Sequence, residues 1–469
     1  MARSKSCVVL SFFVVVLAGT VAFAQDGATE DNQGRAAQEA RDARVSGEDS
    51  VRRATVRKKR KRVQRPRRRV RVAPCRQEWV FAGGKFGYEG SVLFSQSTEP
   101  EVEPMHLGYG VLGFGWEREC RRTARRAPGV FDNLNFDVEL RARTGYDGRG
   151  DFDIRTLMFS QSADWYRLRV GWQQIAWGET FGSQVLDVVN PRDLSDPFRR
   201  DLSWIRRSIP AVNTQFFLGK ASLQGVYVPW PESPRLAPKG SIFDPLRGTL
   251  PPGVEVAPYD KPPLGGGAEG GARLSYLFDF GLDVALLHYS SGQRMPVYDM
   301  EIRDMRPVLV PVDTRVALSG LSYSYSRGSL VIRGDHAFID GQAVPSRTGL
   351  IVKEQVMQSV LGVDAQVGDS FHVGVQYHRD DYSDEARDSL SWLVRVVPPS
   401  SSFELDLMLF HGLNHSDLWF QSKLSWSMTG SLEFFLSHDV FDGKANDRLS
   451  AIAFFRGMNR TFSGLEVSF

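Results

Sequence analysis

The stretch "FHGLNHSDLW" gathers the side chains of this chain that are best suited to acid–base or nucleophilic chemistry. A histidine beside a hydroxyl or a carboxylate could activate a nucleophile for hydrolysis. The same stretch separates two apparent strands, 402–411 and 417–427, and Asn, Ser and Asp favour tight turns through local hydrogen bonds. We therefore expect turn chemistry here and no enzyme activity. The residues concerned are His411, Asn414, His415, Ser416 and Asp417.

Motifs for metals, nucleotides and cofactors are missing from the remaining sequence. The eight histidines form no H-E-x-x-H, and there is no paired C-x-x-C, no P-loop and no G-x-G-x-x-G between a strand and a helix. No cofactor or metal is expected. Cys75 and Cys120 can form one disulfide in an oxidising compartment if their Cα atoms come close enough.

The first 24 residues have the layout of a secretory signal peptide. A short basic start precedes an apolar run that ends near Val21, and the small-residue sequence Ala22-Phe23-Ala24 follows. No later stretch reaches the 18 or so apolar residues that a membrane helix needs. Residues 1–24 are therefore predicted to direct export and to be removed.

A basic arm precedes the body of the chain. Residues 51–72 contain 13 Lys or Arg and no acid, whereas the sequence from Ala73 onward carries a net charge of −8. Residues 25–72 are predicted to be disordered. An exported chain rarely meets nucleic acid, so none is expected as a partner. The arm could bind an anionic envelope polymer, lipid headgroups or lipopolysaccharide, or it could be a solvated tail.

The body alternates apolar and polar residues with a period of two. In 135–144, Val138 and Leu140 share one face while Arg141 and Arg143 share the other, because successive side chains of a strand point to opposite faces. Soluble sandwiches alternate too. Segments of about ten residues, tight turns between them and aromatic residues toward their ends favour a membrane barrel. Further segments of this kind are 165–174, 369–381 and 417–428.

The number of segments and the last strand specify the barrel further. Residues 73–469 are predicted to form an all-β, transmembrane, antiparallel up-and-down β-barrel of sixteen to eighteen strands, because closure alone pairs every backbone group in lipid. The chain ends in an amphipathic strand with Phe469 at its terminus. Such an end is typical of outer-membrane proteins and is read by the barrel assembly machinery. The predicted location is the outer membrane of a diderm bacterium, among its lipid and lipopolysaccharide.

Three interruptions are too long for hairpins: 178–211, 231–269 and 291–314. The first follows "GWQQIAWGE" and contains "DVVNPRDLSDPF". This pattern resembles the "G-x-Q-x-x-x-W-G-E … V-x-N-P-x-D" strand and loop of a bacterial outer-membrane β-barrel family of unknown function. That family is grouped with porin-like and alginate-export-type barrels. The resemblance implies a barrel and transport. It does not extend to the basic arm.

The loop after Trp177 has two possible positions. If it folds inward, its charges could set a constriction and its ion preference; if it lies outside, they are solvated. The apolar residues of "DVVNP" favour the inward position, and Trp177 itself is expected at the lipid interface. The candidate pore-lining residues are Arg141, Arg143, Arg167, Arg169, Glu179, Asp187, Arg192, Asp193, Arg333, Asp335 and Lys423.

The predicted function is a porin-like channel or exporter for passive permeation of small polar or anionic solutes. A wide barrel leaves an aqueous lumen that side chains cannot fill. Paired arginines on neighbouring strands would favour anions, or they could form wall salt bridges that only stabilise the barrel. The alternative is a plugged barrel that acts as an adhesin or a surface-binding structural protein through the 231–269 loop.

Overall fold

A computed structural model of the chain describes its body from residue 75 to the C-terminus, with gaps. The signal peptide predicted for 1–24 and the arm predicted for 25–72 lie outside the described residues. The ranges are 75–95, 104–120, 133–144, 150–180, 185–199, 202–238, 241, 243–244, 253–257, 267–295, 297–312, 314–345, 351–382, 385–444, 447, 450 and 452–469.

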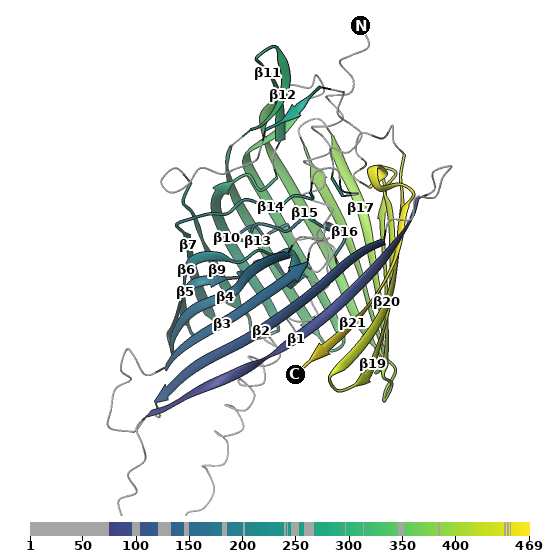
Figure 1. Ribbon diagram of the computed structural model, residues 1–469. Coiled ribbons are helices and arrows are strands. Elements are labelled where there is room, and N and C mark those ends of the chain that lie inside the picture. The colour runs from purple at the N-terminus through teal and green to yellow at the C-terminus, as the bar shows by residue number, and fades with distance from the viewer. Residues whose placement is uncertain are drawn as a thin grey trace, which may run out of the picture.

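Eighteen antiparallel strands form one sheet that closes on itself (Figure 1). Each strand pairs with its neighbours along the chain, and the last strand, β21, pairs with the first, β1, in a register that places Lys85 opposite Ser468. The backbone of Phe469 continues this seam, because its N–H donates to the carbonyl of Gly84 at 3.0 Å. The prediction of an all-β up-and-down barrel is confirmed.

The barrel strands follow the period-two segments of the sequence. Their bounds are β1 Cys75–Ser95, β2 Pro104–Cys120, β3 Asn133–Thr144, β4 Gly150–Ala163, β5 Tyr166–Gln173, β6 Ile209–Leu218, β7 Ala221–Val228, β9 Glu269–Leu277, β10 Leu282–Gly292, β13 Arg315–Arg327, β14 Leu330–Pro345, β15 Ile351–Val367, β16 Phe371–Asp381, β17 Ala386–Val396, β18 Phe403–Gly412, β19 Leu418–Thr429, β20 Leu432–Asp442 and β21 Met458–Ser468.

The two ends of the barrel differ in their connections. At one end, here called the turn end, strands join through short links such as 219–220, 328–329 and 430–431. At the other, the loop end, the connections include 174–208 and 229–268. In barrels of this class the short turns face the periplasm and the long loops face outward.

Strand length varies more than the expected ten residues. The first strand, β1, has 21 residues and β2 has 17, whereas β5 and β7 have only 8 each. Figure 1 shows β1 and β2 running obliquely beyond their neighbours. Barrel strands must tilt to close the sheet, and the β1–β2 ladder continues past the seam with β21 to the pair Cys75 and Cys120.

The outer surface of the barrel is apolar. Large side chains that alternate with the inward residues stay exposed on neighbouring strands, among them Phe159, Val170, Phe216, Leu223, Leu274, Leu286, Phe338, Leu361, Trp392 and Leu424. Lipid can cover such a surface, and closure of the sheet pairs the backbone groups of its first and last strands. The chain is an integral β-barrel of the outer-membrane type.

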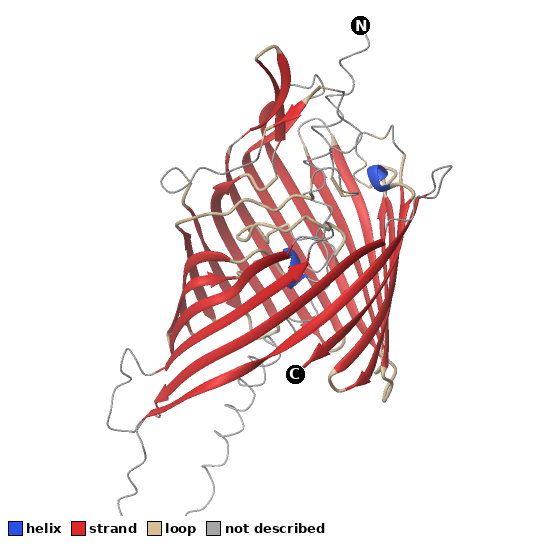
Figure 2. Cartoon of the chain, in the orientation of Figure 1, coloured by secondary structure: helices blue, strands red, loops and turns tan. Residues whose placement is uncertain are grey.

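Helices contribute little to this architecture. In the part of the chain that the structure describes, the helical segments are the helix α3 at Leu202–Ile205 and the 3-10 turn η1 at Ala453–Phe455, drawn in blue in Figure 2. Within the described ranges, no helix has the length and apolar character to cross a membrane. A small sheet of β8 (Glu255–Val256), β11 (Val297–Arg303) and β12 (Arg306–Val312) stands at the loop end (Figure 1).

Candidate functional site

The connection between β5 and β6, residues 174–208, crosses the inside of the barrel and is called here the lumen segment. Its first part carries Ile175, Trp177, Leu186 and Val189, all buried. They pack against inward-facing apolar residues of β6, β7, β10, β13, β14 and β15, which we call the first seat. Figure 2 shows the segment as a loop within the ring of strands. The apolar residues of this part are buried against the wall.

The position of Trp177 corrects one expectation. Trp177 was expected at the lipid interface, but it is 2% exposed and lies inside the barrel. Its indole N–H donates to the Gln224 side chain of β7 at 2.9 Å, and its ring meets Tyr289 of β10 edge-on at 5.6 Å. Trp prefers any site that buries its ring and satisfies its N–H, and the lumen wall offers both.

Asn190 ties the two ends of the lumen segment together. Its side-chain oxygen accepts from the backbone N–H of Ile175 at 2.7 Å, and its amide donates to the carbonyls of Gln173 and Arg207 at 3.2 and 2.7 Å. One buried amide thus satisfies backbone groups from both ends of a 35-residue connection. Pro191 follows and excludes helical geometry at Asn190. The Asn-Pro pair closes the base of the segment.

The far end of the segment is held by aromatic packing. Phe198 lies against Trp419 of β19, Phe441 of β20 and Phe455 of η1, with ring centroids 5.0, 4.4 and 4.7 Å apart. These rings belong to a second buried cluster that also contains Phe243 and is called here the second seat. The lumen segment is therefore anchored on opposite parts of the wall.

Ion pairs add to the second seat. Asp196 accepts from Arg460 of β21 at 2.7 Å, and Arg460 also donates to Asp439 of β20 at 2.5 Å; these groups are almost fully buried. Arg199 pairs with Glu89 of β1 at 2.8 Å. Buried pairs of this kind contribute little net stability, but losing one partner leaves a costly unpaired charge. They fix the path of the segment across the lumen.

A carboxylate of the wall holds the segment just after Trp177. Asp335 of β14 accepts from the backbone N–H groups of Glu179 and Thr180 at 3.0 to 3.1 Å, and from the Thr180 hydroxyl at 2.6 Å. Gly178 permits this approach, because its φ is +96° and a Cβ atom there would lie 2.8 Å from the Asp335 carboxylate. Burial raises the pKa of the Glu179 carboxyl, and the neighbouring Arg273 opposes the rise.

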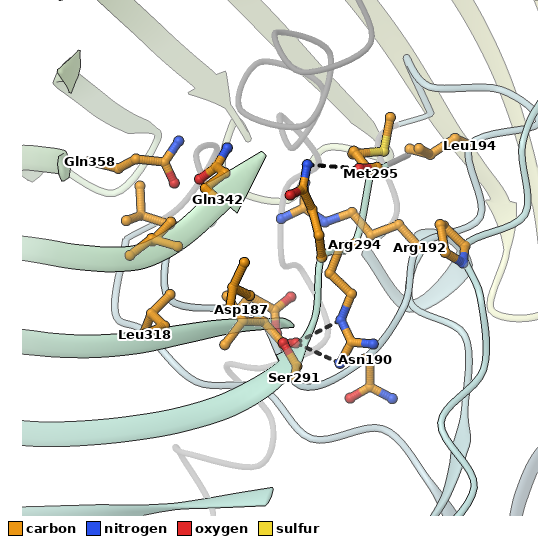
Figure 3. A pocket seen from close by; sticks show the side chains of 16 residues that line it. Asp187, Asn190, Arg192, Leu194, Ser291, Arg294, Met295, Leu318, Gln342 and Gln358 are labelled. Atoms are coloured by element: carbon orange, nitrogen blue, oxygen red, sulfur yellow. Dashed lines mark hydrogen bonds between the residues drawn. The ribbon is translucent and has the colours of Figure 1, made fainter. Parts of the chain in front are cut away.

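A cavity of about 120 Å³ lies between the lumen segment and the wall strands β10, β13, β14 and β15 (Figure 3). Its charged lining is Asp187 and Arg192 from the segment and Arg294, which follows β10. Asp187 also pairs with Arg206 at 2.6 Å. Arg294 donates to the carbonyls of Val188 and Val189. Five neutral polar residues and eight apolar residues complete the wall: Asn190, Ser291, Gln293, Gln342 and Gln358, with Val185, Val188, Leu194, Pro234, Met295, Val316, Leu318 and Ile339. The cavity therefore presents charged and amide groups beside apolar side chains.

The structure brings eight of the predicted residues into three groups. Arg143 donates to Asp193 at 2.5 Å, beside Arg141. Arg333 lies beside Glu179 and Asp335. Asp187 and Arg192 share the cavity.

Other predicted residues lie apart from these groups. Arg167 lies over the Phe217 ring and Lys423 over the Phe435 ring, at 5.8 and 5.0 Å, while Arg169 lies on the β5 face shared with Arg167. Phe469 stacks on Phe86 at 5.4 Å at the seam. The backbone register places Cys75 directly opposite Cys120.

The histidine stretch forms a packed network at the loop end. Arg387 of β17 donates to His415 at 3.1 Å and to Asp417 at 2.6 Å, and Asp417 accepts from the backbone N–H of Ile452 at 2.9 Å. Ser416 donates its N–H to Asp447. Burial and the Arg387 charge lower the pKa of His415 to about 4. The network connects strand ends to the second seat, since Ile452 belongs to both.

Several residues that hold the site were not among the predicted ones. Asn190 stands in the V-x-N-P-x-D pattern, but that pattern did not indicate its role. The partners of Asn190, Phe198 and Arg460 are distant in sequence, so no local signal predicts these contacts. Arg294 and its partner Glu269, 2.7 Å apart, had one signal: both are charged residues at the ends of strands whose interiors are largely apolar. Charged residues at strand ends indicate where a barrel strand leaves the membrane, but they do not predict that Arg294 contacts the lumen segment.

Comparisons with known proteins add only a general likeness. No protein-family model and no curated protein matches the chain. Among solved structures it is similar to OccAB4 of Acinetobacter baumannii, with a TM-score of 0.47 and 8% identity over 82% of this chain and 97% of that one. A loop-deleted OmpT of Vibrio cholerae has a TM-score of 0.42 and 9% identity, over 84% of this chain and 100% of that one. OmpF of Salmonella typhi, in complex with daunomycin, has a TM-score of 0.40 and 10% identity, over 84% of this chain and 97% of that one.

Proposed function

We propose that this outer-membrane barrel is a porin-like channel for passive permeation of small polar or anionic solutes, with the lumen segment as its constriction. The observation that carries the proposal is the cavity between the segment and the β10–β15 wall. A segment anchored at two seats narrows the lumen, and the proposed passage beside it is this cavity, which has charged, neutral polar and apolar lining. The sequence resemblance to alginate-export-type barrels makes export of an anionic solute by the same passage part of the proposal.

The charges around the cavity support a preference for anions. Three guanidinium groups, those of Arg192, Arg206 and Arg294, stand against two carboxylates: Asp187, which pairs with Arg206, and Glu269, which pairs with Arg294. The net local charge is positive, and charged rings at a constriction set ion selectivity. The residues concerned lie on the segment and on the strand that faces it, so the passage is charged on both sides.

Planar-bilayer recording of the refolded full chain tests the proposal. We expect discrete conductance steps and a reversal potential that favours chloride over potassium. Arg192→Gln should shift that potential toward cations, while Arg303→Gln, in the exposed β11–β12 hairpin, should not. A chain that inserts into bilayers yet never conducts, even when Phe198→Ala releases the second seat, would disprove the channel.

The second candidate is a plugged barrel with a surface-binding role. The two seats and the Asp335 tether could hold the segment as a permanent plug. The β11–β12 hairpin also presents apolar side chains at the loop end, with Met305 94% and Ile302 80% exposed. Silent bilayers together with protease cleavage of this hairpin and of 231–269 on intact cells would favour it. The histidine stretch is proposed to be structural, so His415→Ala and Ser416→Ala should alter no hydrolytic activity.

The partners proposed for the barrel follow from its location. Membrane lipid and lipopolysaccharide should surround it, and the assembly machinery should read the strand that ends at Phe469. Deleting Phe469 should slow insertion without changing single-channel conductance, because the residue lies at the seam and away from the cavity.

A further inference from the structure

The barrel wall is interrupted on one side. Strand β4 pairs with β3 from Gly150 to Gln161, but β5 covers only its second half, Leu157–Ala163. No described strand pairs with the free edge of 150–156, because β5 ends at Gln173 and β6 begins at Ile209. The Ser208 hydroxyl donates to the carbonyl of Arg155 at 2.5 Å and bridges part of the gap. The gap lies toward the loop end, beside the outer leaflet.

A cavity of about 280 Å³ occupies this interruption. Its lining comes from both sides of the wall. Phe152 and Trp172 lie on the apolar outer faces of β4 and β5, and Phe152 is 61% exposed. Arg141, Asp153 and Arg155 come from the lumen side, and Arg206, Arg207 and Arg235 come from the two long connections. Two carboxylates, Asp153 and Glu232, also line the cavity; Glu232 pairs with Arg207 at 2.7 Å, and Arg155 pairs with Glu139 at 3.1 Å. Apolar groups and an excess of cations therefore meet in one opening that leads from the lipid side toward the lumen.

Arg141 is the most deeply buried cation of this cavity, with only 2% of its surface exposed. One amino group donates to Asp153 at 2.7 Å, and the guanidinium carbon lies 4.5 Å from the centre of the Trp204 ring. Its Nε and second amino group have no hydrogen-bond partner among the described residues. A buried donor without a partner is costly, and an anion in the adjacent cavity would remove that cost.

We propose that this opening is a lateral binding site for an anionic amphiphile taken from the outer leaflet. Its phosphate or carboxylate headgroup accepts hydrogen bonds from Arg141, with Arg155 and Arg207 completing the charge, because guanidinium groups match such oxyanions with two donors. Its acyl chain lies along Phe152 and Trp172. This site is separate from the cavity at the lumen segment, and its occupancy does not depend on the chain being a channel.

Native mass spectrometry of the full chain released from phosphatidylcholine vesicles containing phosphatidic acid tests the proposal. We expect one tightly retained phosphatidic acid per chain and no comparable retention of phosphatidylcholine. Arg141→Gln should weaken retention about tenfold or more, since it removes a charge-assisted contact. Arg306→Gln, in the exposed hairpin, is the matched control and should retain the lipid.

Two further variants keep the test decisive. Arg207→Gln removes a less buried charge of the same cavity and should weaken retention even if the Arg141 variant fails to fold. Phe152→Ser should weaken the retention of phosphatidic acid, because the acyl chain loses its contact. Inorganic phosphate should compete with the lipid headgroup as well as it does in the wild type. Equal retention by the wild type and both arginine variants would overturn the proposal. Binding of inorganic phosphate without phosphatidic acid would overturn it as well, because the site would then take free anions only. None of these measurements uses conductance, so a failure of the channel proposal would not change their outcome.

Discussion

The two seats of the lumen segment are built from different chemistry. The first seat, around Trp177, is a patch of aliphatic and aromatic side chains, in which the Trp177 indole donates to Gln224 and the Tyr289 hydroxyl donates to Glu269. The second seat, around Phe198, combines stacked rings with the buried Arg460–Asp196 and Arg460–Asp439 pairs. Apolar packing is non-directional, whereas buried ion pairs demand exact partners. The first seat therefore contributes mainly stability to the packing of the lumen segment, and the second seat fixes where the segment lies.

The largest expected effect is at the first seat. Trp177→Ala should lower the free energy of unfolding by about 3–5 kcal/mol, because it leaves a cavity in a packed cluster. It should also raise single-channel conductance by freeing the segment. Urea unfolding in lipid vesicles and bilayer recording measure the two effects. Trp177→Phe, which keeps a ring and loses the bond to Gln224, should cost only about 1 kcal/mol. Equal effects of both variants would contradict the cohesive role.

At the second seat, Asp196→Asn should cost about 2–3 kcal/mol, because Arg460 loses one of its two buried carboxylates. Asp196→Glu should recover part of the loss. The expected change in conductance is larger current noise rather than a larger mean, since the segment shifts while the first seat holds. Unchanged noise with lost stability would show that the pair does not position the segment.

The tether between the seats gives a smaller expected effect. Asp335→Asn leaves one side-chain oxygen for donors that now share two, and it should cost about 1–2 kcal/mol. The thermal unfolding midpoint should fall accordingly. Asp340→Asn, exposed at the rim of the same strand, is the control and should change nothing. If Asp340→Asn lowered the unfolding midpoint as much as Asp335→Asn, the loss of stability would come from strand β14 and not from the contact with the lumen segment.

A pH effect is expected beside the second seat. The pKa of His415 is about 4 in the folded chain and 6.5 in the unfolded one. Between these values the unfolded chain binds more protons, so stability falls as pH drops through this range. The unfolding midpoint of wild type should therefore decrease more than that of His415→Gln on acidification. A parallel decrease in both proteins would assign the pH dependence to other groups.

The smallest effect on the two seats is expected from the cysteine pair Cys75 and Cys120, which lies far from both. We propose that Cys75 and Cys120 form a disulfide, because directly opposed residues of antiparallel strands have Cα atoms about 4.5–5.5 Å apart, within the disulfide range. Oxidised protein should migrate faster than reduced protein on a non-reducing gel, and Cys75→Ser should abolish the shift. Conductance should be the same in all three forms. A free-thiol assay that finds two thiols in exported protein would disprove the bond.

The sequence alone determined the wall of this protein. Alternation in segments such as 135–144 and 417–428 specified strands with one apolar and one polar face, and only a closed barrel can satisfy all their backbone groups in lipid. The turns at 328–329 and 430–431 were readable because turn residues act locally. The alternation put Arg141, Arg143 and Asp335 on the charged faces of their strands, and in the structure Arg143 and Asp335 contact the lumen segment.

The interior was decided by the tertiary structure. Whether "DVVNP" lies inside or outside depends on a seat assembled from six strands, and no local pattern encodes such a surface. Trp177 illustrates the reason: its preference for a partly polar boundary fits a lipid interface and a lumen wall equally, and only closure of the barrel brought Gln224 and Tyr289 within reach. The same holds for Phe198 and the interruption beside β4, since both depend on contacts between segments far apart in the chain.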